Sequence, residues 1–443
     1  MENKKVSGFG FRGWMLIVYQ AAAFFAWMVF ANYPINFLSD LHGGAQAVSM
    51  VYTISTVICV LVQLIYNKFI GKVKNIKNLS IIYGLITLLT GAVLCFINVI
   101  PNILWLLCYA VCNFCGGMWA TFTVGILVGQ WFPTRKGTIM GIATFAMPIG
   151  NGLTGVFATL LYANGSFNLG KAFLPFYAVS VAGWLIGLIF LKDYPEQCGC
   201  YRDNDRTMTA DIAKAMMEQE IENKKSSVWG IGRVFASSDF WKLVIPSGFL
   251  VMFSASVMMQ SSTIIGQYSE ELSFVGGYTG TMAIICVVGC FGSWLVGVLD
   301  TKLGTKNALM ISVGIMILSG ILGAFPSVYM LFASFICLAL FMGAGSNFSV
   351  SFVAQYWRGE DFGNVFSISS PVVNVFSAFG PSLVALLMVS SFGYRAIFIC
   401  SAVMGVISMI LLLSFKPSHV KVIDDKYRLA AGKPIDDALV GRK

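Results

Sequence analysis

Charged residues are scarce in this sequence. Asp, Glu, Lys and Arg together make up 11% of the 443 residues, whereas a soluble globular domain carries about a quarter. Apolar residues account for 57%, and the mean hydropathy is +0.78. Water therefore cannot be the solvent for most of the surface, which excludes a soluble globular protein.

Histidine is rarer still, with two residues, and neither His42 nor His419 stands in a metal-binding or triad spacing. The chain has 11 cysteines, most of them within apolar runs. The CxxC at 112–115 lies in such a run and is interpreted as two small packing residues, while the CGC at 198–200 has no nearby histidine. We expect no metal site, no cofactor and no enzymatic activity. Residues 1–14 lack an apolar segment with a cleavage site, so no cleaved signal peptide is expected.

Long apolar runs are what the sequence does have. A membrane-spanning helix needs about 20 mostly apolar residues, and strand-like alternation is absent, so the runs are expected to be helices that satisfy their own backbone hydrogen bonds. The sequence thus predicts an all-α integral membrane protein with twelve transmembrane helices. The expected spans are 14–37, 46–67, 78–99, 103–130, 138–163, 171–191, 241–267, 275–299, 307–325, 328–355, 363–389 and 394–415.

One polar segment divides these spans into two groups of six, and a second follows the last span. The division predicts a six-helix bundle at 1–191, a central loop at 192–240, a second six-helix bundle at 241–415 and a tail at 416–443. All Lys and Arg residues except Lys171 and Arg395 fall on the side that carries both tails, the central loop and the even-numbered connections. This asymmetry predicts that both termini are cytoplasmic. The same topology accounts for the net charge of +9 without nucleic acid as a partner.

The two predicted bundles resemble each other in sequence. NKFIGKVK at 67–74 follows the second span, and DTKLGTK at 300–306 follows the eighth. Similarly, Gln-Trp at 130–131 with a glycine at 137 corresponds to Tyr-Trp at 356–357 with a glycine at 363. Two related halves joined by a long loop are typical of a transporter whose site lies between them near the membrane midplane.

At these residues the chain resembles the major facilitator superfamily. Both post-span loops are similar to its Gly-x-x-x-Asp-Arg-x-Gly-Arg-Lys signature in a degenerate form, with Asn67 in place of the acid in the first copy. WFPTRKGTIMG at 131–141 and the segment 354–382 resemble the oxalate/formate-antiporter and monocarboxylate-porter branch. The resemblance implies two six-helix bundles in the major facilitator fold that rock about a central cavity, with a small organic anion as substrate. It also implies conformational or gating roles for Asn67, Gly71, Arg135, Gly137, Asp300 and Gly304.

The resemblance further implies that Asp300 accepts hydrogen bonds from the N-terminus of the eleventh span. Asn67 can form hydrogen bonds but no ion pair, so we expect Asp300 to matter more to the conformational cycle.

The sequence departs from this branch in one respect. Its carboxylate carriers commonly place Arg or Lys in the eighth or eleventh span, but neither 275–299 nor 363–389 contains a charged residue. A charge in the middle of a membrane usually marks a substrate or proton site, and none lies deep in any expected span. Asp40, Glu270 and Glu271 are the nearest acids to the outer face. They are interpreted as solvated loop residues, and a part in ion coupling remains open.

Uncharged polar and aromatic side chains are therefore the candidates for the substrate site. A polar stripe on a spanning helix must face protein or water, so each stripe predicts either helix–helix hydrogen bonding or substrate contact. The densest stripe, at 367, 370, 374 and 377, lies in the eleventh span. The family's architecture implies that spans 1, 4, 5, 7, 8, 10 and 11 line the cavity. The cavity candidates are Gln20, Phe24, Trp27, Asn113, Trp119, Gln260, Asn347, Ser370 and Asn374.

These observations predict a secondary active transporter that moves a monocarboxylate or related organic acid across the plasma membrane by alternating access. One alternative is an ion-coupled exporter or importer of amphipathic or neutral small molecules. Another is a membrane sensor that keeps the fold but does not transport. The expected partners are the small-molecule substrate, a co- or counter-transported ion or anion and the lipid bilayer, with the protein acting as a monomer.

Overall fold

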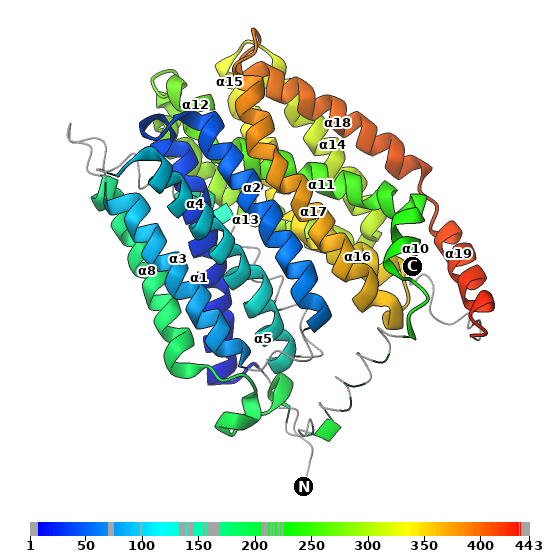
Figure 1. Cartoon of the computed structure of the whole chain (residues 1–443). Coiled ribbons are helices and arrows are strands. Elements are labelled where there is room, and N and C mark those ends of the chain that lie inside the picture. The colour runs from blue at the N-terminus through cyan, green and yellow to red at the C-terminus, as the bar shows by residue number, and fades with distance from the viewer. Residues whose placement is uncertain are drawn as a thin grey trace. The chain divides into compact units, whose positions relative to one another are not determined.

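The computed structural model describes residues 8–69, 75–97, 100–132, 139, 146, 148–153, 156, 169–205, 207, 211–212, 215, 218, 222, 226–433 and 435. Side chains are described for these residues except 66–69, 169–172, 344–347 and 359. Every element of regular secondary structure in this part of the chain is a helix, which confirms the predicted all-α fold (Figure 1).

Ten helices in the described ranges are long and apolar enough to cross a membrane, and they match all the expected spans except the fifth and the tenth. The fifth, 138–163, lies almost wholly outside the described residues. The tenth is divided into α15 (Val328–Met342) and α16 (Ala344–Tyr356), which meet at Gly343. A Cβ atom on Gly343 would collide with the Ser293 side chain, so only glycine permits this close approach.

The contacts within the chain divide it into two compact units. Unit 1 comprises Met1–Ala215 and Val257–Val287, and unit 2 comprises Met216–Ser256 and Val288–Lys443. Two helices, α11 (Ser238–Met259) and α13 (Gly277–Leu303), contribute residues to both units. The division at 191 and 240 expected from the sequence stays a prediction.

Unit 1 contains most of the N-terminal helices. Its elements are α1 (Phe11–Tyr33), the π-helix η1 (Pro34–Leu38), η2 (Ser39–Leu41), α2 (Gly44–Phe69), α3 (Ile76–Phe96), α4 (Asn102–Gly117), the π-helix η4 (Met118–Thr123), α5 (Val124–Trp131), α8 (Leu169–Phe190), η5 (Pro195–Cys198), η6 (Arg202–Asn204), α12 (Ser261–Ile264), η7 (Gly266–Tyr268) and η8 (Ser273–Val275). The helices α1, α3, α4 and α8 lie side by side (Figure 1).

Aromatic side chains form the core of unit 1. Trp105, Tyr109 and Trp119 are fully buried, and Phe30 packs against Phe173 with ring centroids 5.4 Å apart. Rings of this size bury a large apolar area with few rotatable bonds, so they fix α1, α4 and α8 as one packed group.

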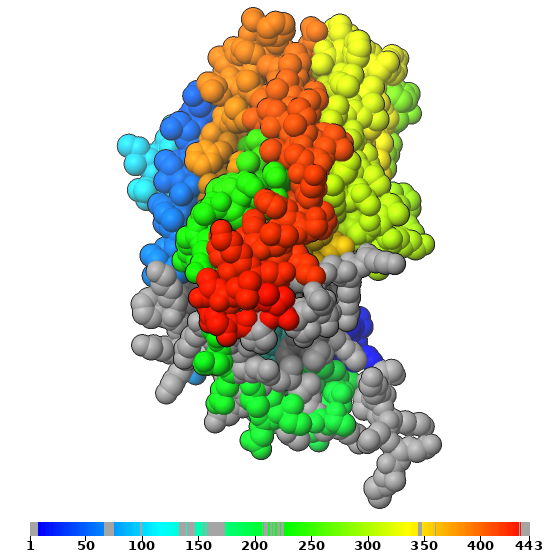
Figure 2. Space-filling view, turned by 90° about the vertical axis from the view of Figure 1, so that its right-hand side faces the viewer, coloured from blue at the N-terminus to red at the C-terminus, as the bar shows by residue number. Residues whose placement is uncertain are grey.

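Unit 2 contains the C-terminal helices. Besides most of α11 and the second part of α13, its elements are α10 (Ile231–Ala236), α14 (Thr305–Ala324), α15, α16, α17 (Gly359–Met388), α18 (Tyr394–Ser414) and α19 (Pro417–Ala430). Figure 2 shows the face on which α14 and α18 lie side by side. At their crossing, a Cβ atom on Gly320 would lie 2.6 Å from the backbone nitrogen of Ala402. Small residues thus let the two backbones approach closely, as is common between membrane helices.

Charged side chains occupy only the ends of the ten apolar helices. Lys77, Lys306 and Arg395 lie in first turns, and Asp300 lies in the last turn of its helix. This placement keeps each charge near the membrane surface and avoids the cost of burying it in hydrocarbon. Within these helices the membrane interior therefore carries only neutral polar groups.

Candidate functional site

Asn113 on α4 lies at the centre of a polar cluster in unit 1. Its Oδ1 accepts a hydrogen bond from Trp27 Nε1 at 3.0 Å, and its Nδ2 donates to Ser55 Oγ and Thr56 Oγ1, both at 2.8 Å. The Asn113 side chain is buried. Phe24 completes the group, with its ring edge-on to Trp27 at 5.7 Å. The structure thus brings three predicted site residues together, and the amide of Asn113 holds α1, α2 and α4 in register.

Trp119, in η4, belongs to a second buried cluster. Its Nε1 donates to Tyr19 Oη at 2.7 Å, and Tyr19 Oη lies 2.8 Å from Ser80 Oγ. A Cβ atom on Gly84 would lie 2.9 Å from the Trp119 ring, so this ring needs a glycine opposite it on α3. Gln20, next to Tyr19, is also buried. The π-helical turn at 118–123 shifts the register of the helix here, and such turns are frequent at functional sites.

Gln260 marks an interruption of the expected seventh span. Its backbone (φ −123°, ψ 21°) leaves the helical region between α11 and α12, and its side chain is buried. Asn36 in η1 caps the break: its Nδ2 donates to the carbonyl of Met258 at 3.2 Å, and its Oδ1 accepts from the backbone nitrogen of Ser262 at 3.3 Å. Ser262 Oγ donates to the carbonyl of Asn36 at 2.7 Å. Unit 1 therefore ties the end of the first span to the seventh through one asparagine, which sequence reasoning did not single out.

Ser370 and Asn374 on α17 form the candidate site in unit 2. With Ser377 they are half-buried, and none of the three side chains forms a hydrogen bond with any residue that the structure describes. Pro371 in the same stretch removes a backbone donor, which leaves the carbonyl of Ser367 without its helical partner. This stretch therefore contains uncharged donors and acceptors that are not engaged in hydrogen bonds with the described residues. Asn347 lies on α16, and the structure describes its backbone but not its side chain.

The loop after α13 is built around Gly304. The backbone of Gly304 has φ +81° and ψ 157°, a region open to glycine. The next two backbone N–H groups bond to α16: Thr305 N donates to Gln355 Oε1 at 2.7 Å, and Lys306 N donates to Tyr356 Oη at 3.1 Å. These bonds cap the N-terminus of α14.

The hydrogen-bond partner of Asp300 differs from the expected one, while its role in the conformational cycle stays a prediction. Its Oδ1 accepts a hydrogen bond from Thr305 Oγ1 at 2.7 Å, and no bond to the start of α17 is found among the described residues. Thr305 follows Asp300 by five residues in the sequence, and the loop pattern does not reveal that these two side chains bond to each other. In the first half, the Asn67 side chain, Gly71, Arg135 and Gly137 lie outside the described residues, so their roles stay predictions.

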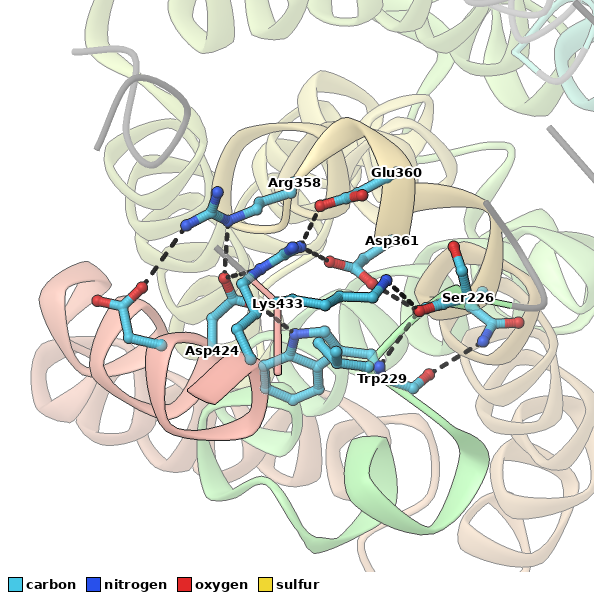
Figure 3. A network of polar contacts seen from close by, with 12 residues as sticks. Ser226, Trp229, Arg358, Glu360, Asp361, Asp424 and Lys433 are labelled. Atoms are coloured by element: carbon cyan, nitrogen blue, oxygen red, sulfur yellow. Dashed lines mark hydrogen bonds and ion pairs between the residues drawn. The ribbon is translucent and has the colours of Figure 1, made fainter. Parts of the chain in front are cut away.

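A cluster of buried charges at the start of α17 was missed by sequence reasoning (Figure 3). Arg428 on α19 donates to Asp424 Oδ2 at 3.0 Å and to Asp361 Oδ2 at 2.8 Å, and it also pairs with Glu360. Arg358 donates to the same oxygen of Asp424 at 2.8 Å. Burial works to lower the pKa of Arg428, but the bond to Asp424 and the surrounding carboxylates raise it above its usual value. The guanidinium therefore stays charged.

The segment before α11 completes this charge cluster. Trp229 Nε1 donates to Asp424 Oδ1 at 2.8 Å, and Ser227 Oγ donates to Asp361 Oδ1 at 2.6 Å (Figure 3). The end of the central loop, the start of α17 and the tail helix are thereby bonded to one another. The sequence held one signal for this, the Asp–Arg pair at 424 and 428, whose i, i+4 spacing favours a helix.

Asp40, Glu270 and Glu271 are exposed, in η2 and in the turn between η7 and η8. Their part in ion coupling remains a prediction. No group of His, Cys, Asp and Glu that could hold a metal ion occurs among the residues described.

The family model described as "Major Facilitator Superfamily" matches residues 15–326 and 297–437 of the chain. No curated protein matches the chain. Among solved structures, the chain is similar to a mutant of the nucleoside transporter NupG, with a TM-score of 0.63 and 12% identity over 91% of this chain and 99% of that one. It is also similar to the xylose transporter XylE from E. coli in a partially occluded inward-open conformation, with a TM-score of 0.67 and 12% identity over 90% and 96% of the two chains.

A bacterial homologue of the human lysosomal transporter Spinster gives a TM-score of 0.63 and 15% identity, over 93% of this chain and 98% of that one. At these identities the three likenesses establish the fold, and the twelve-helix architecture expected from the sequence is confirmed.

Proposed function

Because the chain belongs to the Major Facilitator Superfamily, we propose that it is a secondary active transporter that moves a small organic anion across the plasma membrane. Transport by a multi-pass membrane protein follows from the family, and so does the exclusion of enzymatic activity. The proposal adds the substrate class, with monocarboxylates and related organic acids as the first candidates, and alternating access between two six-helix bundles as the mechanism.

The observation that carries the proposal is the polar stretch of α17. Ser370, Asn374 and Ser377 are half-buried, and their side chains form no hydrogen bond with the described residues. Side chains that are not engaged with neighbouring helices can bond to a ligand without first breaking a bond within the protein, whereas a group already paired must give up that bond. Hydroxyl and amide N–H groups are suitable donors to a carboxylate. The resemblance of residues 131–141 to the loop of organic-anion carriers supports the same class.

The other candidate residues divide into two proposed roles. Gln20, Phe24, Trp27, Gln260 and Asn347 are proposed to contact the substrate with Ser370 and Asn374. Asn113 and Trp119 are proposed to position Trp27 and Tyr19, since their polar atoms bond to those side chains.

A second candidate function is transport of neutral polar molecules. It is favoured by the described apolar helices, whose charged residues all lie near helix ends, because an uncharged site suits an uncharged substrate. The titles of similar structures name a nucleoside and a sugar as substrates of those proteins.

Counterflow in proteoliposomes tests the proposal. Purified protein is reconstituted with an unlabelled compound inside, and uptake of the labelled compound is followed for a panel of monocarboxylates, dicarboxylates, nucleosides and sugars. Accumulation of a monocarboxylate is expected. Accumulation of neutral compounds alone would establish the second candidate, and no counterflow with any compound would favour the non-transporting sensor. Imposed pH and sodium gradients then identify a coupled ion.

The site is tested in the same assay with Asn374→Ala and Gln260→Ala. Loss of one hydrogen bond to a charged ligand is expected to raise the apparent KM of Asn374→Ala by a factor of about 10 to 150, since such bonds contribute about 1.5–3 kcal/mol. Ser414→Ala, at the end of α18, is the matched control and should leave the KM unchanged. Unchanged uptake and KM in both site variants would remove the proposed site while leaving transport itself established.

A further inference from the structure

A shallow apolar groove runs along the outer surface of unit 2 between α14 and α18. It consists of two cavities, of about 350 and 310 Å³, which share Ile321, Ala402 and Val403 in their walls. The first cavity extends to Phe325 and Arg395. The second extends in the other direction along the same helices, so the two form one continuous groove.

The groove follows from the close crossing of the two helices. Gly320 fits against the backbone of Ala402, and a Cβ atom on Gly405 would lie 2.6 Å from a side-chain carbon of Ile317. Small residues at the crossing bring the backbones together. Larger apolar side chains on either side, such as Ile321 and Val403, remain about half exposed, at 47% and 55%, and form the walls.

Arg395 gives one end of the groove a positive charge. Its Nε donates to the carbonyl of Ala324, the last residue of α14, at 2.7 Å. This bond holds the guanidinium at the level where α14 ends and α18 begins. Its two terminal nitrogens form no hydrogen bond or ion pair with any described residue. A cation in this position, at the end of two membrane-spanning helices, lies at the depth of lipid head groups.

We propose that this groove binds a phospholipid, with its phosphate on Arg395 and one acyl chain lying along α14 and α18. The charge complementarity is that of a guanidinium and a phosphate, which form strong paired hydrogen bonds. The length also fits: residues 395 to 407 of α18 line the groove, and at about 1.5 Å per residue they extend about 18 Å. One leaflet of the hydrocarbon core is about 15 Å thick.

Native mass spectrometry of the full-length protein in detergent tests this site. The delipidated protein is incubated with phosphatidylglycerol or with a glycosyl diacylglycerol that carries the same acyl chains but no phosphate. We expect one phosphatidylglycerol per protein, retained about tenfold more strongly than the glycolipid, because a charge-assisted hydrogen bond is lost with the phosphate. Arg395→Gln should abolish this preference. Lys416→Gln removes an exposed charge beyond the other end of α18 and should preserve it.

A second pair of variants tests the acyl-chain groove. Val403→Trp fills the groove and should lower retention of both lipids, whereas Leu413→Trp, on an exposed part of α18 outside the two cavities, should not. A photoreactive phosphatidylglycerol should label peptides that contain residues 317–325 and 395–407 in the wild type.

Equal retention of phosphatidylglycerol by wild type and Arg395→Gln would overturn the phosphate contact, and labelling elsewhere would overturn the groove. Dimers that dissociate in Val403→Trp would show that a second copy of the chain occupies this face instead.

Discussion

Gly304 is a residue at which backbone conformation and space both require glycine. Its φ of +81° with ψ of 157° is a combination that side chains with a Cβ rarely adopt, and a Cβ there would lie 3.0 Å from Gln355 Nε2. The same Gln355 side chain caps α14 through Thr305 N. A substitution at Gly304 therefore disturbs both the turn and the cap.

We expect Gly304→Ala to destabilise the protein by about 1–3 kcal/mol, the usual cost of a strained backbone position. The measurement is the apparent melting temperature in detergent. Gly297→Ala is the matched control, because Gly297 lies within α13 and a Cβ atom there would have no neighbouring atom within 4 Å. An equal fall in both variants would show that helix α13, and not the turn, is the sensitive element.

At the scale of the helix, α19 shows how an exposed tail becomes part of a folded unit. Val420, Asp424 and Arg428 recur every fourth residue and are buried, so they form one face of the helix. The face contacts the start of α17 through Asp361 and Glu360. Figure 2 shows α19 against the segment that precedes α11, where the Arg233 guanidinium lies 4.5 Å from the Tyr427 ring centroid.

Arg428→Met is expected to release this helix. Removal of the guanidinium leaves the carboxylates of Asp361 and Asp424 buried with less compensating charge, and breaking a buried ion pair from one side costs about 3–5 kcal/mol. Limited proteolysis should then cleave the chain after residue 415, and the melting temperature should fall. Lys426→Met removes an exposed cation from the same helix and should behave as wild type. Resistance of Arg428→Met to cleavage would mean that the remaining contacts of α19, among them those of Asp424 with Arg358 and Trp229, hold the helix without Arg428.

The apolar helices were predictable from the sequence because the requirement for crossing a membrane is local: about 20 consecutive, mostly apolar residues. It did not predict α19 or its partners. Arg358 and Asp424 are 66 residues apart in the chain, and nothing in the residues around either one identifies the other. The loop pattern likewise did not reveal that Thr305 Oγ1 donates to Asp300, and the part of Asp300 and Gly304 in the conformational cycle stays a prediction.

At the scale of the whole chain, lysines at corresponding places in the two predicted halves bond in the same way. Lys77, near the start of α3, donates through Nζ to the carbonyl of Leu188 at 3.0 Å, at the end of the sixth span. Lys306, near the start of α14, donates through Nζ to the carbonyl of Phe415 at 2.8 Å, just after the twelfth. Each lysine lies at or just after its copy of the repeated loop pattern. The first turn of the third span in each half is thus bonded to the end of that half's last span.

The candidate substrate site was only partly predictable. The sequence identified polar stripes, but could not tell which members bond to neighbouring helices. Asn113 is occupied by Trp27, Ser55 and Thr56, whereas Ser370 and Asn374 have no such partner among the described residues. The difference depends on which side chains face each other across helices, and helical spacing alone leaves that open.

The proposed cycle of the whole transporter makes a prediction at Asn36 and Ser262. The predicted division of the chain places Asn36 in the first bundle and Ser262 in the second, and in unit 1 they are joined by three hydrogen bonds of 2.7 to 3.3 Å. If the bundles rock against each other, this contact must break once in each cycle. A covalent link between the two residues would therefore arrest transport.

Asn36→Cys with Ser262→Cys supplies that link. Oxidation should reduce counterflow of the identified substrate to background, and dithiothreitol should restore it, because the disulfide holds one end of the cycle closed without altering the site on α17. The variants Asn36→Cys and Ser262→Cys, each made alone, add one cysteine to the chain's own 11. They control for oxidation elsewhere and should transport equally before and after treatment. Full counterflow by a protein shown by mass spectrometry to carry the disulfide would mean that this contact stays closed throughout, and that the bundles move about another point.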